Sequence, residues 1–307
     1  MSAPHIEPRI KHLAGHVGDV GGLPIVRALP HRQRRTIGAW CFLDHAGPAN
    51  LQGRGMDVPP HPHTGLQTFS WMIEGEVLHR DSLGHEQVLR PGQVNLMTAG
   101  RGIAHSEQSL GERLHLAQLW IALPDEQRFC APAFQHFPVL PVLARDGFKL
   151  TLLVGELLGE RSPVPTHSPL LGADIMCPGM ADSVLPLQPG FEHGLMVLEG
   201  ALDVEADGEP AEALAPGALL YLAPGLQSLR LCADAPARVL LLGGEPLAQP
   251  PLLWWNFVGR TREEIAHFAQ AWNSLSAEFT DVVVTGYASS GGLERLLSPE
   301  VPALRAP

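Results

Sequence analysis

The sequence predicts an all-β fold of two tandem β-barrels followed by one short helix. The chain has 307 residues, and at roughly 150 residues per domain this length suggests two domains. Its 32 glycines and 29 prolines are spread along the chain without a period, which favours short strands and tight turns over long helices. Apolar stretches that end in glycine or proline recur about every ten residues, a rhythm typical of β-barrels and sandwiches.

In the first half of the chain, the pattern predicts three strands separated by glycine and proline turns. The strand that begins at Gly65 is the clearest, because the side chains on both of its faces are partly apolar. Two partly apolar faces are expected where a sheet closes into a barrel. The expected strands are 37–43, 65–75 and 114–123, and the expected turns are 44–48, 74–75, 82–84 and 90–92.

The second half of the chain repeats this rhythm. Pro91 follows Gly75 by 16 residues, and Pro216 follows Gly200 by the same distance, which indicates two copies of one barrel. Residues 126–150 include three prolines and are predicted to form a linker with one edge strand. We therefore expect an N-terminal barrel in residues 1–140 and a C-terminal barrel in residues 141–307, with strands at 184–187 and 195–198.

One helix is predicted near the C-terminus, at about residues 261–274. Thr261 and Glu264 have the spacing of a capping box, in which each side chain bonds to the backbone N–H of the other residue. The apolar residues that follow fall on one face of a helix. We expect this helix to cap the open end of the C-terminal barrel. That face consists of Ile265, Phe268, Ala269 and Trp272.

Composition excludes several classes of partner. Hydrophobic residues make up 45% and charged residues 17% of the chain, which is typical of a folded protein. The formal charge of −11 argues against direct binding to nucleic acid or to an anionic membrane surface. The sequence has no signal-peptide pattern, no membrane-spanning apolar stretch and no C-x-x-C pair among its four cysteines. These features predict a cytoplasmic protein.

Two short segments carry residues that could bind a metal. His61 and His63 lie two positions apart, as do His105 and Glu107. In extended chain, residues i and i+2 point to the same face, so two neighbouring strands would bring all four side chains together. Three imidazoles and one carboxylate suit Fe, Mn, Co, Ni, Cu or Zn and leave open coordination positions. The alternative interpretation is that these histidines form hydrogen bonds in a polar core or lie in a proline-rich loop.

These segments resemble a known family. The stretches PHPHTGLQTFSWMIEG, HRDSLG and RPGQVNLMTAGRGIAHSE resemble the N-terminal barrel of the pirins, a branch of the cupin superfamily, and WWNFVGRTREEI resembles bacterial pirins. The resemblance covers residues 36–125 and the tail and is faint between 145 and 240. It implies a bicupin, with iron(II) in the N-terminal barrel. The family's ligands fall on His61, His63, His105 and Glu107.

The sequence departs from the family at Gln67, where pirins usually keep a glutamate. Glu107 fits as the carboxylate ligand, so Gln67 is expected to lie just outside the ligands. His79 and His85 flank a predicted hairpin turn and are expected to be solvated. The second barrel has His193 but no H-x-H pair, so no metal is expected there.

Two functional hypotheses follow, and they leave open whether the protein is an enzyme. Members of the family show quercetin 2,3-dioxygenase activity, so the resemblance implies an oxidoreductase that acts on an aromatic, flavonol-type substrate. Glu107 would be its catalytic base. Apolar candidates to line the substrate pocket are Phe69, Trp71, Met97 and Trp120.

The second hypothesis is a redox-sensing regulatory protein. Some pirins bind a transcription factor or a metabolic enzyme, and the acidic charge of this chain suits a basic protein partner better than DNA. A third interpretation is that the metal only stabilises the barrel, but the open coordination positions argue against it, because structural sites are usually closed.

Overall fold

The computed structural model describes residues 9–51, 55–276, 283–288 and 294–301, and it has two compact units. The first barrel unit comprises the described parts of residues 17–25, 41–139 and 249–307. The second barrel unit comprises the described parts of residues 1–16, 26–40 and 140–248. The predicted single boundary at residue 140 is therefore incomplete. Segments at both ends of the chain belong to the barrel that is distant in sequence, because their strands and side chains complete its sheet and core.

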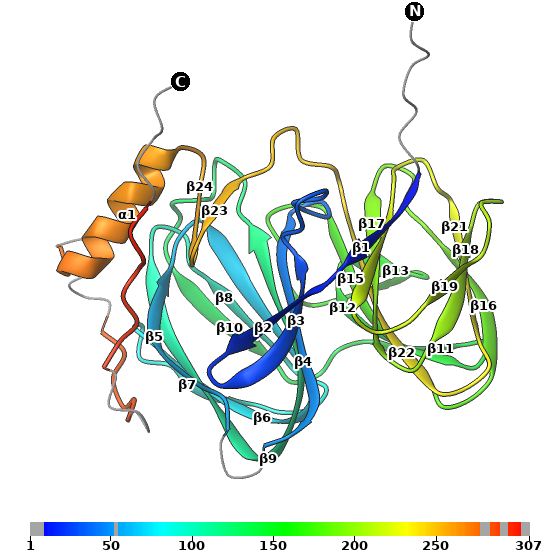
Figure 1. Ribbon diagram of the computed structural model, residues 1–307, viewed down its shortest axis with the longest axis horizontal. Coiled ribbons are helices and arrows are strands. Elements are labelled where there is room, and N and C mark those ends of the chain that lie inside the picture. Colours follow the sequence, from blue (N-terminus) through cyan, green and yellow to red (C-terminus); the bar gives the residue numbers. More distant parts are fainter. Residues whose placement is uncertain (1–8, 52–54, 277–282, 289–293, 302–307) are drawn as a thin grey trace, which may run out of the picture. The chain divides into compact units, whose positions relative to one another are not determined.

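The first barrel unit is built on a nine-stranded sheet, of which seven strands follow the order β10-β8-β6-β9-β4-β3-β2 (Figure 1). The other two strands of the nine are β5, which pairs with β9, and β7, which pairs with β6. The strands are β2 (His16–Val20), β3 (Leu23–Leu29), β4 (Trp40–Asn50), β5 (Asp57–His63), β6 (Leu66–Asp81), β7 (Glu86–Leu89), β8 (Val94–Thr98), β9 (Ile103–Ala122) and β10 (Ala133–Phe137).

The two longest strands of this barrel, β6 and β9, pair with each other in antiparallel orientation. Both strands are longer than predicted, because the expected turn at Glu74-Gly75 is a place where the register shifts rather than a chain reversal. Gly75 has φ +85°, and a Cβ there would run into the carbonyl oxygen of Arg113. Glycine is thus used here to make a bulge that lets one strand continue and bend.

Two other expectations about the first half were wrong. The turn predicted at 44–48 lies inside β4, where Gly47 allows close approach of the backbone at Leu114. The predicted linker 126–150 contains β10 and, in the second barrel unit, β11 (Val142–Arg145) and the start of β12 (Phe148–Val154). Its three prolines lie between these strands and not within them, so they mark strand ends.

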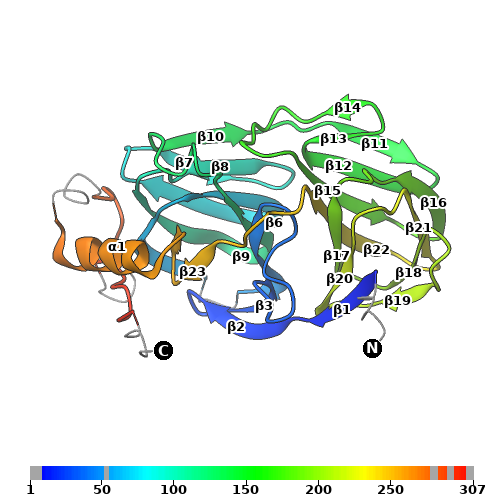
Figure 2. The same ribbon diagram turned by 90° about the horizontal axis from the view of Figure 1, so that it is seen from above.

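The second barrel unit has a seven-stranded sheet, β1-β20-β17-β22-β15-β12-β11, and a four-stranded sheet, β16-β21-β18-β19 (Figure 2). Its core is built largely from buried leucines of both sheets. The remaining strands are β1 (Ile10–Ala14), β13 (Glu156–Leu157), β14 (Glu160–Arg161), β15 (Leu170–Cys177), β16 (Ala181–Pro186), β17 (Glu192–Glu199), β18 (Leu202–Ala206), β19 (Glu212–Leu214), β20 (Ala218–Leu222), β21 (Ser228–Ala233) and β22 (Ala237–Gly244).

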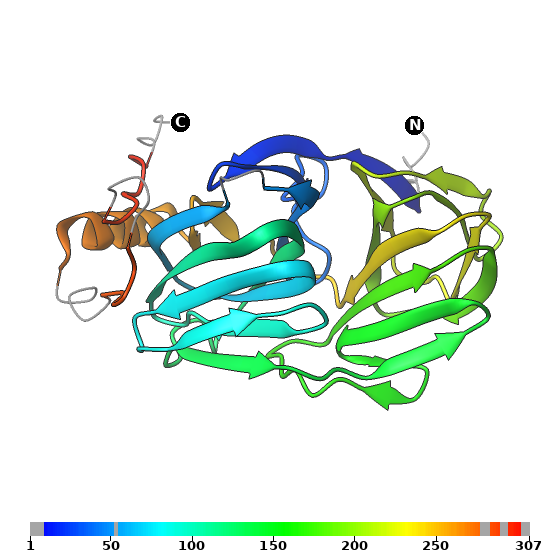
Figure 3. The same cartoon turned by 90° about the horizontal axis from the view of Figure 1, so that it is seen from below.

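The internal repeat predicted from glycine spacing is confirmed by strand pairing. β6 pairs with β8 and β9, and β17 pairs in the same way with β20 and β22. Gly200 has φ +72° and lies beside a register shift in β17, as Gly75 does in β6. In Figure 3 the strands of this repeat can be traced by colour, from cyan to green for β6, β8 and β9 and from yellow-green to dark yellow for β17, β20 and β22.

Helix α1 (Arg262–Ser274) has the predicted capping box and the predicted buried face. It packs against Phe257 and Ala104 together with the short strands β23 (Leu252–Trp254) and β24 (Phe257–Gly259). It therefore belongs to the first barrel unit, and the expectation that it caps the C-terminal barrel was wrong. No helix in the described part of the chain is long and apolar enough to cross a membrane.

Candidate metal centre

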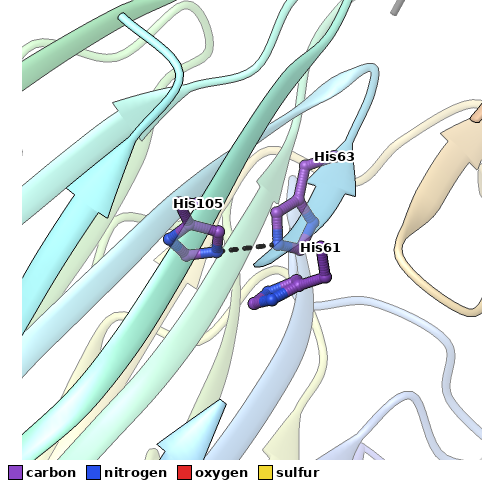
Figure 4. Close-up of side chains that lie close together, drawn as sticks. All are labelled: His61, His63 and His105. Carbon is purple, nitrogen blue, oxygen red and sulfur yellow. Dashed lines mark hydrogen bonds between the residues drawn. The ribbon is translucent and has the colours of Figure 1, made fainter. Parts of the chain in front are cut away.

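Three histidines from two neighbouring strands meet inside the first barrel (Figure 4). His61 and His63 end β5, and His105 lies near the start of β9, directly opposite His61 in the register. Their exposed fractions are 6%, 1% and 2%. The alternation of side chains along β5 puts both of its histidines on the face that meets His105. The i, i+2 spacing read from the sequence is therefore the geometry that forms the cluster.

The imidazole rings are close enough for one ion to contact all three. The Nε2 atoms of His63 and His105 are 3.1 Å apart. The ring centroid of His61 lies 4.4 Å from that of His105 and 5.0 Å from that of His63. One candidate ligand atom from each residue lies within 4.8 Å of the others.

Backbone carbonyls fix two of the three rings. His61 Nδ1 lies 2.9 Å from the carbonyl oxygen of Pro59, and His63 Nδ1 lies 3.1 Å from that of Asn256. A carbonyl can only accept, so each Nδ1–H donates and each Nε2 keeps its lone pair. These residues fit a metal ion, since both offer an unprotonated nitrogen and Nε2 of His63 faces Nε2 of His105. Asn256 was not predicted from the sequence, because 193 residues separate it from His63.

Burial also keeps the three imidazoles neutral. Removal from water lowers the pKa of His61 from 6.5 to about 4. Burial, and then the charges of neighbouring histidines, hold the pKa values of His63 and His105 well below 6.5. A neutral imidazole is the form that binds a metal, so no proton has to leave at neutral pH.

Glu107 lies beside this cluster in a second grouping. Its carboxylate gathers with His79 and His105, again within 4.8 Å, whereas the first group contains His61, His63 and His105. Burial raises the pKa of Glu107 from 4.5 to about 7. The structure thus brings three of the four predicted ligands into one group and joins Glu107 to it through His105. Coordination by all four residues stays a prediction.

His79 is a site residue that the sequence analysis missed. It was expected to be solvated, but it is only 3% exposed and its Nδ1 lies 3.3 Å from Nδ1 of His105. Its ring stacks on Phe134 at 4.3 Å. The available signal was its alternation with Asp81 on a strand that pairs with the strand of His105. Only the side chain of His85, at 43% exposure, is open to solvent as expected.

The pocket residues predicted from the sequence divide between two faces of β6. Trp120 lies 5.0 Å from His63, ring to ring, and shares an apolar cluster with Met97. Both pair directly with Thr68, so their side chains lie on one face of the sheet. Gln67, Phe69 and Trp71 lie at the alternate positions of β6 and point to the opposite face of the sheet. The expectations that Phe69 and Trp71 line the pocket and that Gln67 lies just outside the ligands were therefore wrong.

Gln67 therefore lies on the face of the sheet opposite to Trp120 and the histidine cluster. Its Nε2 donates to the hydroxyl oxygen of Thr98 at 2.9 Å, on the face that alternates with Trp120. The apolar wall near His63 is made instead by Trp120, which stacks on Phe42 with ring centroids 4.0 Å apart. Phe42 was not among the predicted pocket residues, because β4 gives no local sign that it lies beside β9.

Comparison with known proteins places this arrangement in a family. The pirin family model matches residues 22–121, and the model of the pirin C-terminal cupin domain matches residues 172–278. A Pseudomonas aeruginosa protein named "Putative quercetin 2,3-dioxygenase" is 53% identical over 278 residues, which cover 90% of this chain and 86% of that protein. The chain belongs to the pirin family.

This pirin is also similar to human pirin, with 32% identity over 220 residues, 70% of this chain and 75% of that one. A crystal structure of quercetin 2,3-dioxygenase from Acinetobacter baumannii matches with a TM-score of 0.89 and 45% identity, over 95% of this chain and 96% of that one. The two barrels are accordingly the N-terminal and C-terminal cupin domains of a bicupin, as the resemblance implied.

Proposed function

We propose that this pirin is a metal-dependent dioxygenase, with iron(II) as its metal and a flavonol-type aromatic compound such as quercetin as its substrate. The observation that carries the proposal is the convergence of three buried, neutral imidazoles, two of which are fixed with Nε2 free. The names of the relatives from Pseudomonas and Acinetobacter support the choice of reaction.

In this proposal, His61, His63 and His105 hold the metal through Nε2. The metal supplies Lewis acidity and redox chemistry when it is bound. Glu107 accepts the proton of the substrate hydroxyl, a role that suits a carboxyl group whose pKa is about 7. Trp120 offers an aromatic face 5.0 Å from His63, against which a flat substrate ring could pack.

The ligand types alone do not select iron over Mn, Co, Ni, Cu or Zn. The test is therefore metal analysis of freshly purified protein, followed by oxygen uptake with quercetin. The same measurements on His61→Ala/His63→Ala remove two ligands. A matched control is His16→Ala/His167→Ala, in which both histidines are exposed and neither belongs to the cluster.

We expect about one iron per chain and quercetin-dependent oxygen uptake, both lost in His61→Ala/His63→Ala and both kept in the control. Wild-type protein without bound metal would contradict the metal centre. Bound iron without oxygen uptake would contradict the dioxygenase and favour the regulatory hypothesis, which then needs a search for a protein partner.

A further inference from the structure

The third ligand, His105, is held in a different way from His61 and His63. Its Nδ1 faces Nδ1 of His79 at 3.3 Å and not a carbonyl. Nε2 of His79 in turn lies 3.1 Å from a carboxylate oxygen of Asp81. The three residues are 2%, 3% and 1% exposed, so water does not compete strongly for these contacts. They form a chain from the metal cluster to a buried carboxylate.

The contact between His79 and His105 leaves open which nitrogen carries the proton, whereas contact with a carbonyl oxygen would fix it. A neutral imidazole can present to its neighbour either an N–H or a lone pair, and the choice at one nitrogen fixes the other. If His79 presents Nδ1–H, His105 must accept at Nδ1 and then carries its proton on Nε2. That proton would occupy the lone pair that faces the Nε2 atom of His63 and the metal position.

The carboxylate removes the ambiguity. The Oδ1 atom of Asp81 accepts the backbone N–H groups of Leu83 and His85, and these hydrogen bonds favour the ionised carboxylate, which is the ordinary form of an aspartate at neutral pH. An ionised carboxylate only accepts, so Nε2–H of His79 donates to it and Nδ1 of His79 keeps its lone pair. His105 can then donate from Nδ1 and present a free Nε2.

We propose that Asp81 is a positioning residue for the metal centre, which orients the lone pair of His105 through the intervening ring of His79. The inference rests on the metal site proposed above. The carbonyl oxygens of Pro59 and Asn256 fix the tautomers of His61 and His63 directly. For His105, the imidazole of His79 and the carboxylate of Asp81 together fix the tautomer.

Asp81 also has a local structural role that the test must separate. Its Oδ1 accepts the backbone N–H groups of Leu83 and His85 in the turn after β6. Asp81→Asn keeps an oxygen for these two donors, but its NH₂ group would face Nε2 of His79. Nε2 must then accept, which places the proton of His79 on Nδ1, the tautomer that blocks His105.

The closing experiment measures zinc affinity by competition with a chromophoric chelator. In Asp81→Asn we expect affinity to fall about 10- to 100-fold, the usual effect of losing a group that orients a ligand. Asp207→Asn is the matched control, because Asp207 also accepts two backbone N–H groups, from Gln227 and Ser228, but lies in the second barrel unit. It should bind zinc as wild type does.

A second readout does not depend on any variant folding. In the ¹⁵N NMR spectrum of zinc-loaded wild-type protein, His79 should be protonated on Nε2 and unprotonated on Nδ1. Wild-type zinc affinity in Asp81→Asn, or a proton on Nδ1 of His79 in the wild type, would overturn the inference. Either result could occur with normal quercetin turnover, so its failure is distinguishable from failure of the dioxygenase proposal.

Discussion

At the residue scale, burial changes the chemistry of ordinary side chains. The same loss of water lowers the pKa of His61 to about 4 and raises that of Glu107 to about 7, because it penalises the charged form of each. Neutral imidazoles for a metal and a carboxyl group that exchanges its proton near neutral pH therefore lie side by side. Both properties suit the proposed reaction.

Glu107→Gln tests the proton-accepting role at this scale. The substitution keeps the size and polarity of the side chain but cannot accept a proton. We expect oxygen uptake with quercetin, per bound metal ion, to fall about 100-fold or more, the usual contribution of a general base. Glu76→Gln, which changes a half-buried glutamate of β6 that forms an ion pair with Arg90, is the control. An unchanged rate per bound metal would show that Glu107 is not the base.

At the element scale, glycines decide where strands bend and how closely they approach one another. Gly65 joins β5 to β6 with φ +68°, and a Cβ there would run into the carbonyl oxygen of Val258 in β24. This close approach keeps β24, and Asn256 just before it, beside the histidine-bearing end of β5. The connection between two strands thus also helps to position His63.

Gly65→Ala should therefore destabilise the protein more than the backbone angle alone explains. Gly84→Ala is the control, since Gly84 has φ +88° but no atom within 4 Å of its added Cβ. A left-handed backbone costs a non-glycine residue roughly 1–2 kcal/mol, and Gly65→Ala should exceed this by displacing β24. Urea unfolding of both variants measures the difference, and equal losses of stability would contradict the predicted clash.

At the scale of the whole molecule, buried histidines should make metal-free protein sensitive to acid. Their pKa values lie below 6.5 when folded, so between pH 6.5 and about 4 the unfolded chain binds more protons than the folded one. Glu107 and Glu192 have the opposite sign, because burial raises their pKa values and so favours the folded state at low pH. The buried histidines outnumber these two glutamates: they are His45, His61, His63, His79, His105 and His193.

Stability of the metal-free protein should thus fall as the pH is lowered from 7 to 5. Each histidine contributes at most about 1.4 kcal/mol per pH unit within this window. Urea unfolding at pH 7, 6 and 5 in the presence of a chelator would measure the trend. Equal or greater stability at pH 5 would mean that these imidazoles are not buried as neutral groups.

Much of the element pattern was available from the sequence because its causes are local. The capping box at Thr261 and Glu264 and the buried helix face follow from spacing within a few turns of chain. The repeated spacing of glycine and proline predicted that β6 and β17 occupy equivalent positions in the two barrels. Turn predictions failed at Gly47 and Gly75, because a glycine that permits close approach of another strand looks the same in sequence as one that reverses the chain.

The sequence by itself determined the all-β class, two barrels, the terminal helix and the pair spacing that brings His61, His63 and His105 together. Only the tertiary structure decided that α1 and Asn256 belong to the first barrel and that Glu107 joins the cluster through His105. It also decided that the side chains of His79 and Asp81 lie next to His105, in that order. These facts depend on which strands pair across the sheet, and pairing between distant segments is set by packing of the whole barrel, whereas alternation along one strand is set by the local backbone.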